Sequence, residues 1–133
     1  MALKRIVVDT SAYAAFKRSH PLATEALRRA HEILLPAVVL GELLAGFESG
    51  SRRARNRQEL DDFRRSMRVR HVPATEETAE RYAYIYAHLR AVGRPIPTND
   101  LWIAAAAMEH SADLLTADAH YQYVPQIVVT RIA

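Results

Sequence analysis

The feature that most constrains the fold is an alternation of short apolar runs, rich in β-branched residues, with longer segments of helical character. The first run, residues 4–9, carries Ile-Val-Val and stops at turn-forming residues. Residues 33–35, 69–72, 113–116 and 127–130 form four further runs of strand type. Strands that alternate with helices are typical of an α/β domain. We therefore predict a central, mainly parallel sheet of five strands, flanked by helices.

Punctuating residues and apolar periodicity indicate where the helices lie. Pro21 divides the first helical segment, and a helix at residues 36–47 begins with a proline, which suits a first helical turn. A charged helix is predicted at residues 52–67. The clearest amphipathic pattern covers residues 76–92, and residues 101–108 form a helix that is apolar almost throughout. No repeat or linker interrupts this order, so one domain spans residues 1–133.

Composition excludes several classes of protein. The 133 residues, half of them hydrophobic, suffice for one domain with a real core. Cysteine is absent, which rules out disulfides and thiolate metal sites. The first apolar run is too short for a signal peptide, and no stretch approaches the ~20 apolar residues of a membrane span. We therefore expect a cytoplasmic protein that has no contact with a membrane. Its net charge of +3 is compatible with a polyanionic partner.

Four carboxylates stand in unusually apolar surroundings. Asp9 ends the first predicted strand, Asp118 follows the fourth, and Asp100 precedes the apolar helix. Each of these three has an ordinary explanation as a helix cap or a turn residue. Glu42 does not, because it lies in the middle of a helix that is apolar nearly all round. Its ordinary explanation is a buried salt bridge to an arginine.

Taken together, the acids predict a metal centre. Ligands of parallel α/β sheets bind beyond the carboxyl ends of the strands, where the strand order reverses. If the first and fourth strands are neighbours, Asp9 and Asp118 flank that crevice. Clustered carboxylates repel one another unless a cation neutralises them, and hard oxygen ligands favour Mg²⁺ or Mn²⁺. A basic protein with such a pocket is suited to cutting nucleic acid, because a bound metal activates water while arginines hold phosphates.

Four short motifs, taken in their order along the chain, resemble those of a known family. They are Val-Val-Asp-Thr-Ser at residues 7–11, Gly-Glu-Leu at 41–43, Asn-Asp-Leu-Trp-Ile-Ala-Ala-Ala-Ala at 99–107, and Leu-Thr-Ala-Asp-Ala-His-Tyr at 115–121. In this order they resemble the motifs of PIN domains, and within them the VapC-type toxins of bacterial toxin–antitoxin systems. The resemblance covers nearly the whole chain. One departure, Pro-Thr at residues 97–98 where a glycine is common, concerns the shape of that loop.

The resemblance implies a PIN-like parallel sheet with the first and fourth strands adjacent. It also implies an Mg²⁺- or Mn²⁺-dependent endoribonuclease that cuts RNA, is usually a homodimer, and is inhibited by a cognate antitoxin. The metal-binding and catalytic acids carried over by position are Asp9, Glu42, Asp100 and Asp118. The polar residues that would support the pocket are Thr10, Ser11, Asn99 and Thr116; cap and turn chemistry is an equal explanation for Ser11 and Thr116.

Besides the acids, an arginine-rich run and the histidines are candidates for a functional role. The run Ser-Arg-Arg-Ala-Arg-Asn-Arg at residues 51–57 is the densest basic segment. It is a candidate contact for RNA or antitoxin, although such runs are more often solvated helix faces. Its members are Arg52, Arg53, Arg55 and Arg57. The six histidines show no zinc-type spacing, and His120, although close to Asp118, is expected on the surface.

Four other functions compete with a toxin ribonuclease, and the sequence bears on each of them. A phosphatase of the haloacid dehalogenase kind, with Asp9 as nucleophile, would want a second aspartate where Ser11 stands. A receiver-like signalling domain would want adjacent acids near the first strand, and none is there. A catalytically inert module that binds RNA or antitoxin gains nothing from acids that face phosphate. A PIN-type nuclease of RNA processing or DNA metabolism, without a toxin role, stays open as the alternative.

Overall fold

A computed structural model describes residues 3–132 of the chain, and it has a three-layer α/β architecture. The five strands are β1 (Arg5–Val8), β2 (Glu32–Pro36), β3 (Val69–Val72), β4 (Asp113–Thr116) and β5 (Val129–Arg131). The helices are α1 (Thr10–Lys17), α2 (Pro21–Arg29), α3 (Ala37–Glu48), α4 (Arg53–Arg64), α5 (Glu76–Ala91) and α6 (Thr98–Glu109), with a 3₁₀ helix η1 (Ala119–Tyr123) after β4. The predicted order of strands and helices is confirmed.

All four strand pairings in the sheet are parallel, and the order is β3-β2-β1-β4-β5. The predicted neighbours, the first and fourth strands, pair with Val7 opposite Leu114 and Val8 opposite Leu115. The chain therefore runs outward from β1 in one direction to β3 and in the other to β5. Between β1 and β4 the strand order reverses, which makes a topological switch point at that place.

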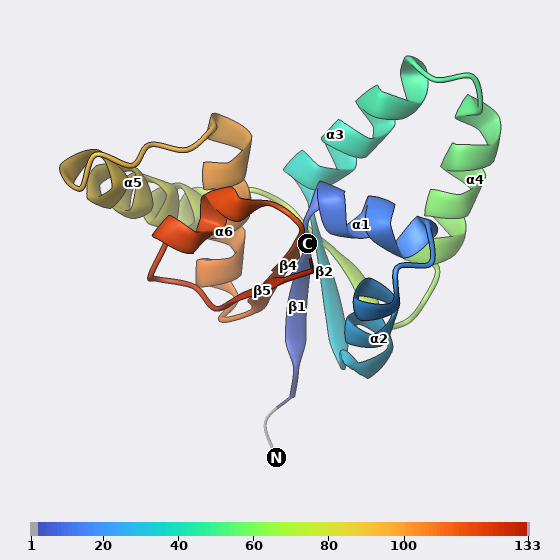
Figure 1. Cartoon of the computed structure of the whole chain (residues 1–133), viewed down its shortest axis with the longest axis horizontal. Coiled ribbons are helices and arrows are strands. Elements are labelled where there is room, and N and C mark those ends of the chain that lie inside the picture. The colour runs from blue at the N-terminus through green and yellow to red at the C-terminus, as the bar shows by residue number, and fades with distance from the viewer. Residues whose placement is uncertain (1–2, 133) are drawn as a thin grey trace.

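The helices cover both faces of the sheet. Figure 1 shows α1, α2 and α4 on one side and α5 and α6 on the other, while α3 and α4 form a hairpin that reaches beyond the strands. Helix α6 is buried nearly all round, at Leu101 and residues 103–107, because it packs between the sheet and α5. Within residues 3–132, none of the helices is long and apolar enough to cross a membrane.

Most element boundaries differ from those expected by one or more residues; α4, for example, ends at Arg64 and not at residue 67. Helix α6 begins at Thr98, three residues before the predicted start, because Pro97 is its N-cap and the first turn therefore includes Asp100. Strand β5 is shifted toward the C-terminus, since its ladder with β4 pairs Leu114 with Val129. The short helix η1 was not predicted, and it places His120 and Tyr121 beside the carboxyl end of β4.

Candidate metal centre

Two of the predicted acids lie at the switch point of the sheet. Asp9 directly follows β1, and Asp118 follows β4 with one residue between. The backbone N–H of Asp9 donates to the carbonyl of Leu115 at 3.0 Å, so the two strand ends are tied together. Asp9 also caps α1, and Asp118 caps η1 through the N–H of His120. The ordinary explanation as caps is thus correct for both, but it does not explain why they converge.

Asp9 belongs to an inner group made of Asp9, Ser11 and Thr116. Its Oδ2 accepts hydrogen bonds from the hydroxyls of Thr116, at 2.6 Å, and Ser11, at 3.0 Å, while Oδ1 accepts from the N–H of Thr10 at 2.9 Å. Burial raises the pKa of the Asp9 carboxyl above its usual value, and these hydrogen bonds oppose the rise. The inner group therefore holds a buried carboxylate in one orientation between β1, α1 and β4.

The hydroxyls of the inner group also hold the loop that carries Asp118. Ser11 Oγ accepts from the N–H of Ala117 at 3.0 Å, and Thr116 Oγ1 accepts from the N–H of Asp118 at 2.9 Å. The two hydroxyls lie 3.2 Å apart. These side chains thus link Asp9 to the backbone that precedes Asp118. Ser11 and Thr116, predicted as supporting residues, each contact both the Asp9 carboxylate and this backbone.

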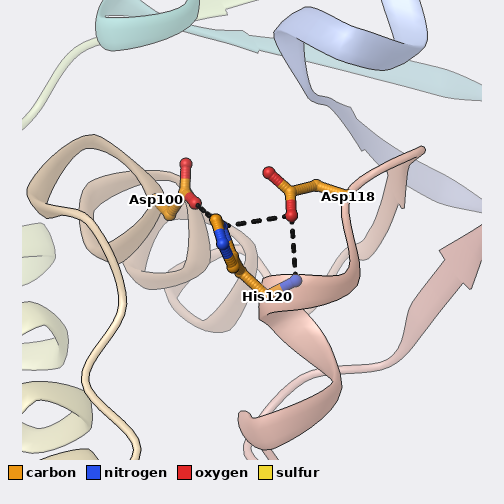
Figure 2. Close-up of side chains that lie close together, drawn as sticks. All are labelled: Asp100, Asp118 and His120. Carbon is orange, nitrogen blue, oxygen red and sulfur yellow. Dashed lines mark hydrogen bonds and ion pairs between the residues drawn. The ribbon is translucent and has the colours of Figure 1, made fainter.

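Asp100, Asp118 and His120 form an outer group, which Figure 2 shows as three side chains from α6, the end of β4 and η1. His120 Nδ1 lies 2.9 Å from Asp100 Oδ2 and 3.1 Å from Asp118 Oδ1. One potential ligand atom from each residue lies within 4.8 Å of the other two. The His120 side chain is 51% exposed and that of Asp100 is 15% exposed, so this group faces solvent at the His120 side.

The electrostatics of the outer group follow from proximity and burial. Burial raises the pKa of the Asp100 carboxyl, and the hydrogen bond from His120 opposes the rise. The same hydrogen bond raises the pKa of the His120 imidazole, because the carboxylates stabilise its protonated form. Burial also raises the pKa of the Tyr121 hydroxyl, and the charges of Asp9 and Asp100 raise it further. A cation among these carboxylates would relieve the repulsion between them.

Glu42 joins the site differently from what its sequence surroundings indicate. Helix α3 buries only Val39 and Leu43, because its other side stays open beyond the sheet, and Glu42 is half-buried. Its Oε1 accepts from Thr10 Oγ1 at 2.6 Å, and its Oε2 accepts from Asn99 Nδ2 at 3.2 Å. Among residues 3–132, no arginine pairs with Glu42, so the salt-bridge explanation is wrong.

A chain of hydrogen bonds therefore connects all four acids or their immediate neighbours in the chain. Thr10 contacts both Asp9 and Glu42, and Asn99, which contacts Glu42, directly precedes Asp100. Asp9 and Glu42 stay outside the compact outer group. The potential metal-ligand atoms gathered here are mainly carboxylate oxygens, with one imidazole nitrogen. Such a set fits a divalent cation of the Mg²⁺ or Mn²⁺ type.

The structure brings two further residues to the acids: His120, for which a surface position was favoured over one lining the site, and Tyr121, which the sequence offered only as the aromatic residue of the last motif. His120 is on the surface, as expected, but its ring also contacts two of the acids. Tyr121 is fully buried, and its hydroxyl has no hydrogen-bond partner among the described residues. The only signal in the sequence was the position of both residues two and three places after Asp118, which does not determine where their side chains point.

The predicted arginines lie apart from the acids, at the start of α4. Arg53 pairs with Glu48 at 2.9 Å, and Arg57 lies 3.9 Å from the same carboxylate. Arg55 pairs with Glu59 at 3.2 Å. Arg52 and Arg55 line a cavity of about 330 Å³ between α1, α3 and α4. Its other lining residues are Tyr13, Ala14, Lys17, Leu43, Phe47, Asn56 and Glu59.

Comparison with known proteins agrees with this architecture. Residues 6–126 match the family described as PIN domain. Two similar proteins of Mycobacterium tuberculosis are named ribonuclease VapC4 and ribonuclease VapC5, and they are 29% and 30% identical to this chain. The first alignment covers 99% of this chain and 100% of the relative, and the second covers 84% and 82%.

Several solved structures of similar fold are named VapBC. One chain of DNA-bound VapBC from Salmonella typhimurium aligns with a TM-score of 0.84 at 21% identity, covering 99% of this chain and 100% of that chain. A chain of VapBC-5 from Mycobacterium tuberculosis, described as a member of a family of toxin–antitoxin systems, aligns with a TM-score of 0.76 at 25% identity, covering 96% and 98%.

Proposed function

The chain belongs to the PIN-domain family, and from this premise we propose that it is a metal-dependent endoribonuclease, the toxin of a toxin–antitoxin pair. One observation carries the proposal: Asp100 and Asp118 meet at His120, beyond the carboxyl end of β4, while Asp9 and Glu42 are hydrogen-bonded to Thr116 and Asn99, which lie within two residues of that pair. The names of VapC4 and VapC5 support ribonuclease activity. The proposed metal-binding acids are Asp9, Glu42, Asp100 and Asp118.

The proposed cofactor is Mg²⁺ or Mn²⁺, because both prefer oxygen ligands and retain waters that substrate phosphates can replace. A bound divalent cation lowers the pKa of its water and neutralises charge on a phosphodiester. The chain's own contribution is orientation. Ser11 and Thr116 hold the Asp9 carboxylate, while Thr10 and Asn99 hold that of Glu42. Acids fixed in this way lose little freedom when a ligand binds, which favours binding.

End-group analysis of a cut synthetic RNA tests the chemistry. With purified protein and Mn²⁺, we expect products with 5′-phosphate and 3′-hydroxyl ends, because water rather than the 2′-hydroxyl is the nucleophile. Replacing the 2′-hydroxyl at the cut site with hydrogen should slow cleavage only through binding, and EDTA should stop it. Cyclic phosphate ends that survive EDTA would assign the chemistry to a histidine acid–base pair.

The proposed protein partner is a cognate antitoxin, since several similar solved structures are named VapBC and one is described as a toxin–antitoxin member. Expression of the chain alone in a bacterial host should arrest growth, and the Asp100→Ala form should be tolerated. If a soluble, well-expressed chain is harmless yet cuts RNA in vitro, the toxin role fails. A nuclease of RNA processing or DNA metabolism is then the better description.

The cavity between α1, α3 and α4 is where we propose that the arginine run contacts a partner. Arg52 and Arg55 lie at its edge, and the apolar side chains of Leu43 and Phe47 line it. An amphipathic antitoxin segment that carries acids fits this combination better than RNA does, because RNA contacts need little apolar surface. Arg55→Glu should weaken antitoxin binding, measured by calorimetry. Arg70→Glu, on the exposed strand β3, is the control.

A homodimer is the remaining part of the proposal. Helix α5 presents two exposed aromatic side chains, Tyr84 at 58% and Tyr86 at 42%, and Tyr86 stacks against Tyr82 with ring centroids 6.3 Å apart. Exposed aromatic side chains are enriched at protein interfaces. Light scattering after size exclusion should give twice the chain mass, and Tyr84→Glu should reduce it. The predicted cytoplasmic location belongs to the same proposal.

A further inference from the structure

The imidazole of His120 lies where a metal ligand would lie. Its Nδ1 is 2.9 Å from Asp100 Oδ2 and 3.1 Å from Asp118 Oδ1, and Figure 2 shows both carboxylates turned toward the ring. Neighbouring ligands of an octahedral Mg²⁺ or Mn²⁺ ion, each about 2.1 Å from the metal, are roughly 3 Å apart. The spacings from Nδ1 to the two oxygens therefore match the distance between neighbouring ligands of such an ion.

The local backbone holds this arrangement. The Asp118 side chain caps η1 by accepting the N–H of His120 at 2.9 Å, so the residue that carries the ring is bound to one of the two acids. The ring nitrogen that faces the carboxylates is Nδ1, and the side chain is half exposed, which leaves Nε2 available to carry the proton. A neutral imidazole with its proton on Nε2 offers the Nδ1 lone pair to a metal.

A single proton on Nδ1 would have to be shared between two carboxylates. The contact with Asp100 meets the geometry of a hydrogen bond. The contact with Asp118 is an ion-pair approach, and the hydrogen bond that Asp118 Oδ1 accepts comes from the backbone N–H of His120. A cation bound to all three atoms would interact directly with both carboxylates, whereas a single N–H would be divided between them.

An independent feature also points to a ligand in the same place. Tyr121 is fully buried, and its hydroxyl lies near Asp100 without meeting the geometry of a hydrogen bond to any described residue. The charges of Asp9, Asp100 and Asp118 act on this hydroxyl. A buried hydroxyl without a partner is costly. Mg²⁺ and Mn²⁺ usually keep several waters, and such a water is a natural partner for this hydroxyl.

We infer that His120 is a direct ligand of the metal centre through Nδ1, together with Asp100 and Asp118, and that this nitrogen gives the centre a preference for Mn²⁺ over Mg²⁺. The inference rests on the proposed function, because it assumes that the acids bind a divalent cation. Imidazole binds transition metals better than it binds Mg²⁺, which selects oxygen ligands. The inference therefore adds a ligand and an order of preference to the four acids.

Calorimetric titration of the RNA-free protein with Mn²⁺ and with Mg²⁺ tests it. His120→Ala should weaken Mn²⁺ binding by roughly tenfold or more, an effect at least equal to that of losing an indirect metal partner. Mg²⁺ binding should change much less. In His120→Asn an amide oxygen can replace Nδ1, so Mg²⁺ affinity should be retained while the preference for Mn²⁺ falls. His71→Asn, exposed on β3, is the matched control and should change neither affinity.

A spectroscopic measurement distinguishes direct coordination of the metal by His120 from a metal that is bound nearby without contacting the ring. With Zn²⁺ as a diamagnetic probe, the ¹⁵N resonance of His120 Nδ1 should shift to a metal-bound position while Nε2 stays protonated. Equal losses of Mn²⁺ and Mg²⁺ affinity in His120→Ala, or an unshifted Nδ1, would overturn the inference. Failure of the proposed function would look different, since the wild-type protein would then bind neither Mn²⁺ nor Mg²⁺ and would show no metal-dependent cleavage of RNA.

Discussion

The inner and outer groups of the site contain the same kind of acid in opposite surroundings. Asp9 is buried, and its oxygens accept three hydrogen bonds from the chain itself. Asp100 and Asp118 instead share a half-exposed imidazole. Asp9 is therefore held in place whether or not a ligand is present, whereas the outer carboxylates can exchange partners. The difference indicates a fixed inner wall and an open face where ligands enter.

The inner group also contributes to the fold itself. Its hydroxyls join the ends of β1 and β4, and hydrogen bonds to a charged group typically contribute about 1.5–3 kcal/mol each. The outer group joins α6 to η1 through one side chain that water reaches. Changes to the inner group should consequently alter stability as well as activity, while changes to the outer group should mainly alter binding of the metal.

The largest expected effect is on catalysis, at the buried acid. Asp9→Asn keeps the size of the side chain and removes its charge, so we expect cleavage of RNA to fall by at least about 100-fold, the upper range for loss of an indirect metal partner. Far-UV circular dichroism should not change. Asp61→Asn, an exposed acid on α4, should retain full activity. An active, purified Asp9→Asn protein would remove Asp9 from the metal centre.

Metal-linked stability tests the outer group. Binding to the folded state alone stabilises by RT ln(1 + [L]/Kd), about 2.7 kcal/mol at a hundredfold excess over Kd. Mn²⁺ should therefore raise the melting temperature, and Asp118→Ala should reduce this rise because one ligand is lost. Asp61→Ala should not change it. If millimolar Mn²⁺ leaves the wild-type melting temperature unchanged, the outer group does not bind the ion.

Thr116→Val measures the hydrogen bonding of the inner group without changing its shape. The variant loses the hydroxyl that donates to Asp9 at 2.6 Å and leaves a buried carboxylate oxygen with one donor fewer. Such a loss costs about 1–3 kcal/mol, which denaturant unfolding of the metal-free protein should detect. Thr130→Val, exposed on β5, should change stability by less than about 0.5 kcal/mol. Equal stabilities of the two variants would contradict a structural role for the inner group.

The smallest effect concerns pH. Burial raises the pKa of Asp9 in the folded protein above the ordinary value of 3.8, so the folded state holds this proton after the unfolded state has lost it. The contribution of Asp9 therefore lowers stability as pH rises from 3.8 through the folded pKa. Asp9→Asn lacks this loss.

The test is the free energy of unfolding of both proteins in EDTA, from pH 3.5 to 7. The free energy of unfolding of Asp9→Asn minus that of the wild type should increase as pH rises from 3.8 through the folded pKa of Asp9, and then level off. Glu25 and Glu59, whose pKa values are lowered by arginine and lysine partners, oppose the trend equally in both proteins and cancel in the difference. A difference that decreases with pH would mean that Asp9 is stabilised as a charge.

Much of the architecture was predictable because its signals are local. An apolar run with a turn former at its end indicates a strand wherever it lies, and in a parallel sheet all carboxyl ends point the same way. With the first and fourth strands as neighbours, as the family resemblance implies, Asp9 and Asp118 were expected near one another, and β1 does pair with β4. The boundary errors, such as the earlier start of α6 at Thr98, arose where a proline cap determines the first turn.

The same reasoning failed for side chains whose surroundings come from distant parts of the chain. Glu42 looks buried when only its apolar neighbours are considered, yet α3 leaves one side open and Thr10 and Asn99 hold the carboxylate. Helical periodicity describes one helix, not what packs against it. Exposure of α3 follows from the position of its neighbours, which no local pattern contains.

The sequence by itself determined where the strands lie along the chain and which acids follow them, because strand propensity acts over a few residues. The adjacency of the first and fourth strands came from the family resemblance. Tertiary structure alone decided which atoms face each other. The contact between Asp100 and His120 joins residues twenty positions apart, and the contact between Asp9 and Thr116 joins residues 107 positions apart. Whether such distant residues come into contact depends on how α6 and η1 pack around the end of β4, and that packing depends on the whole core.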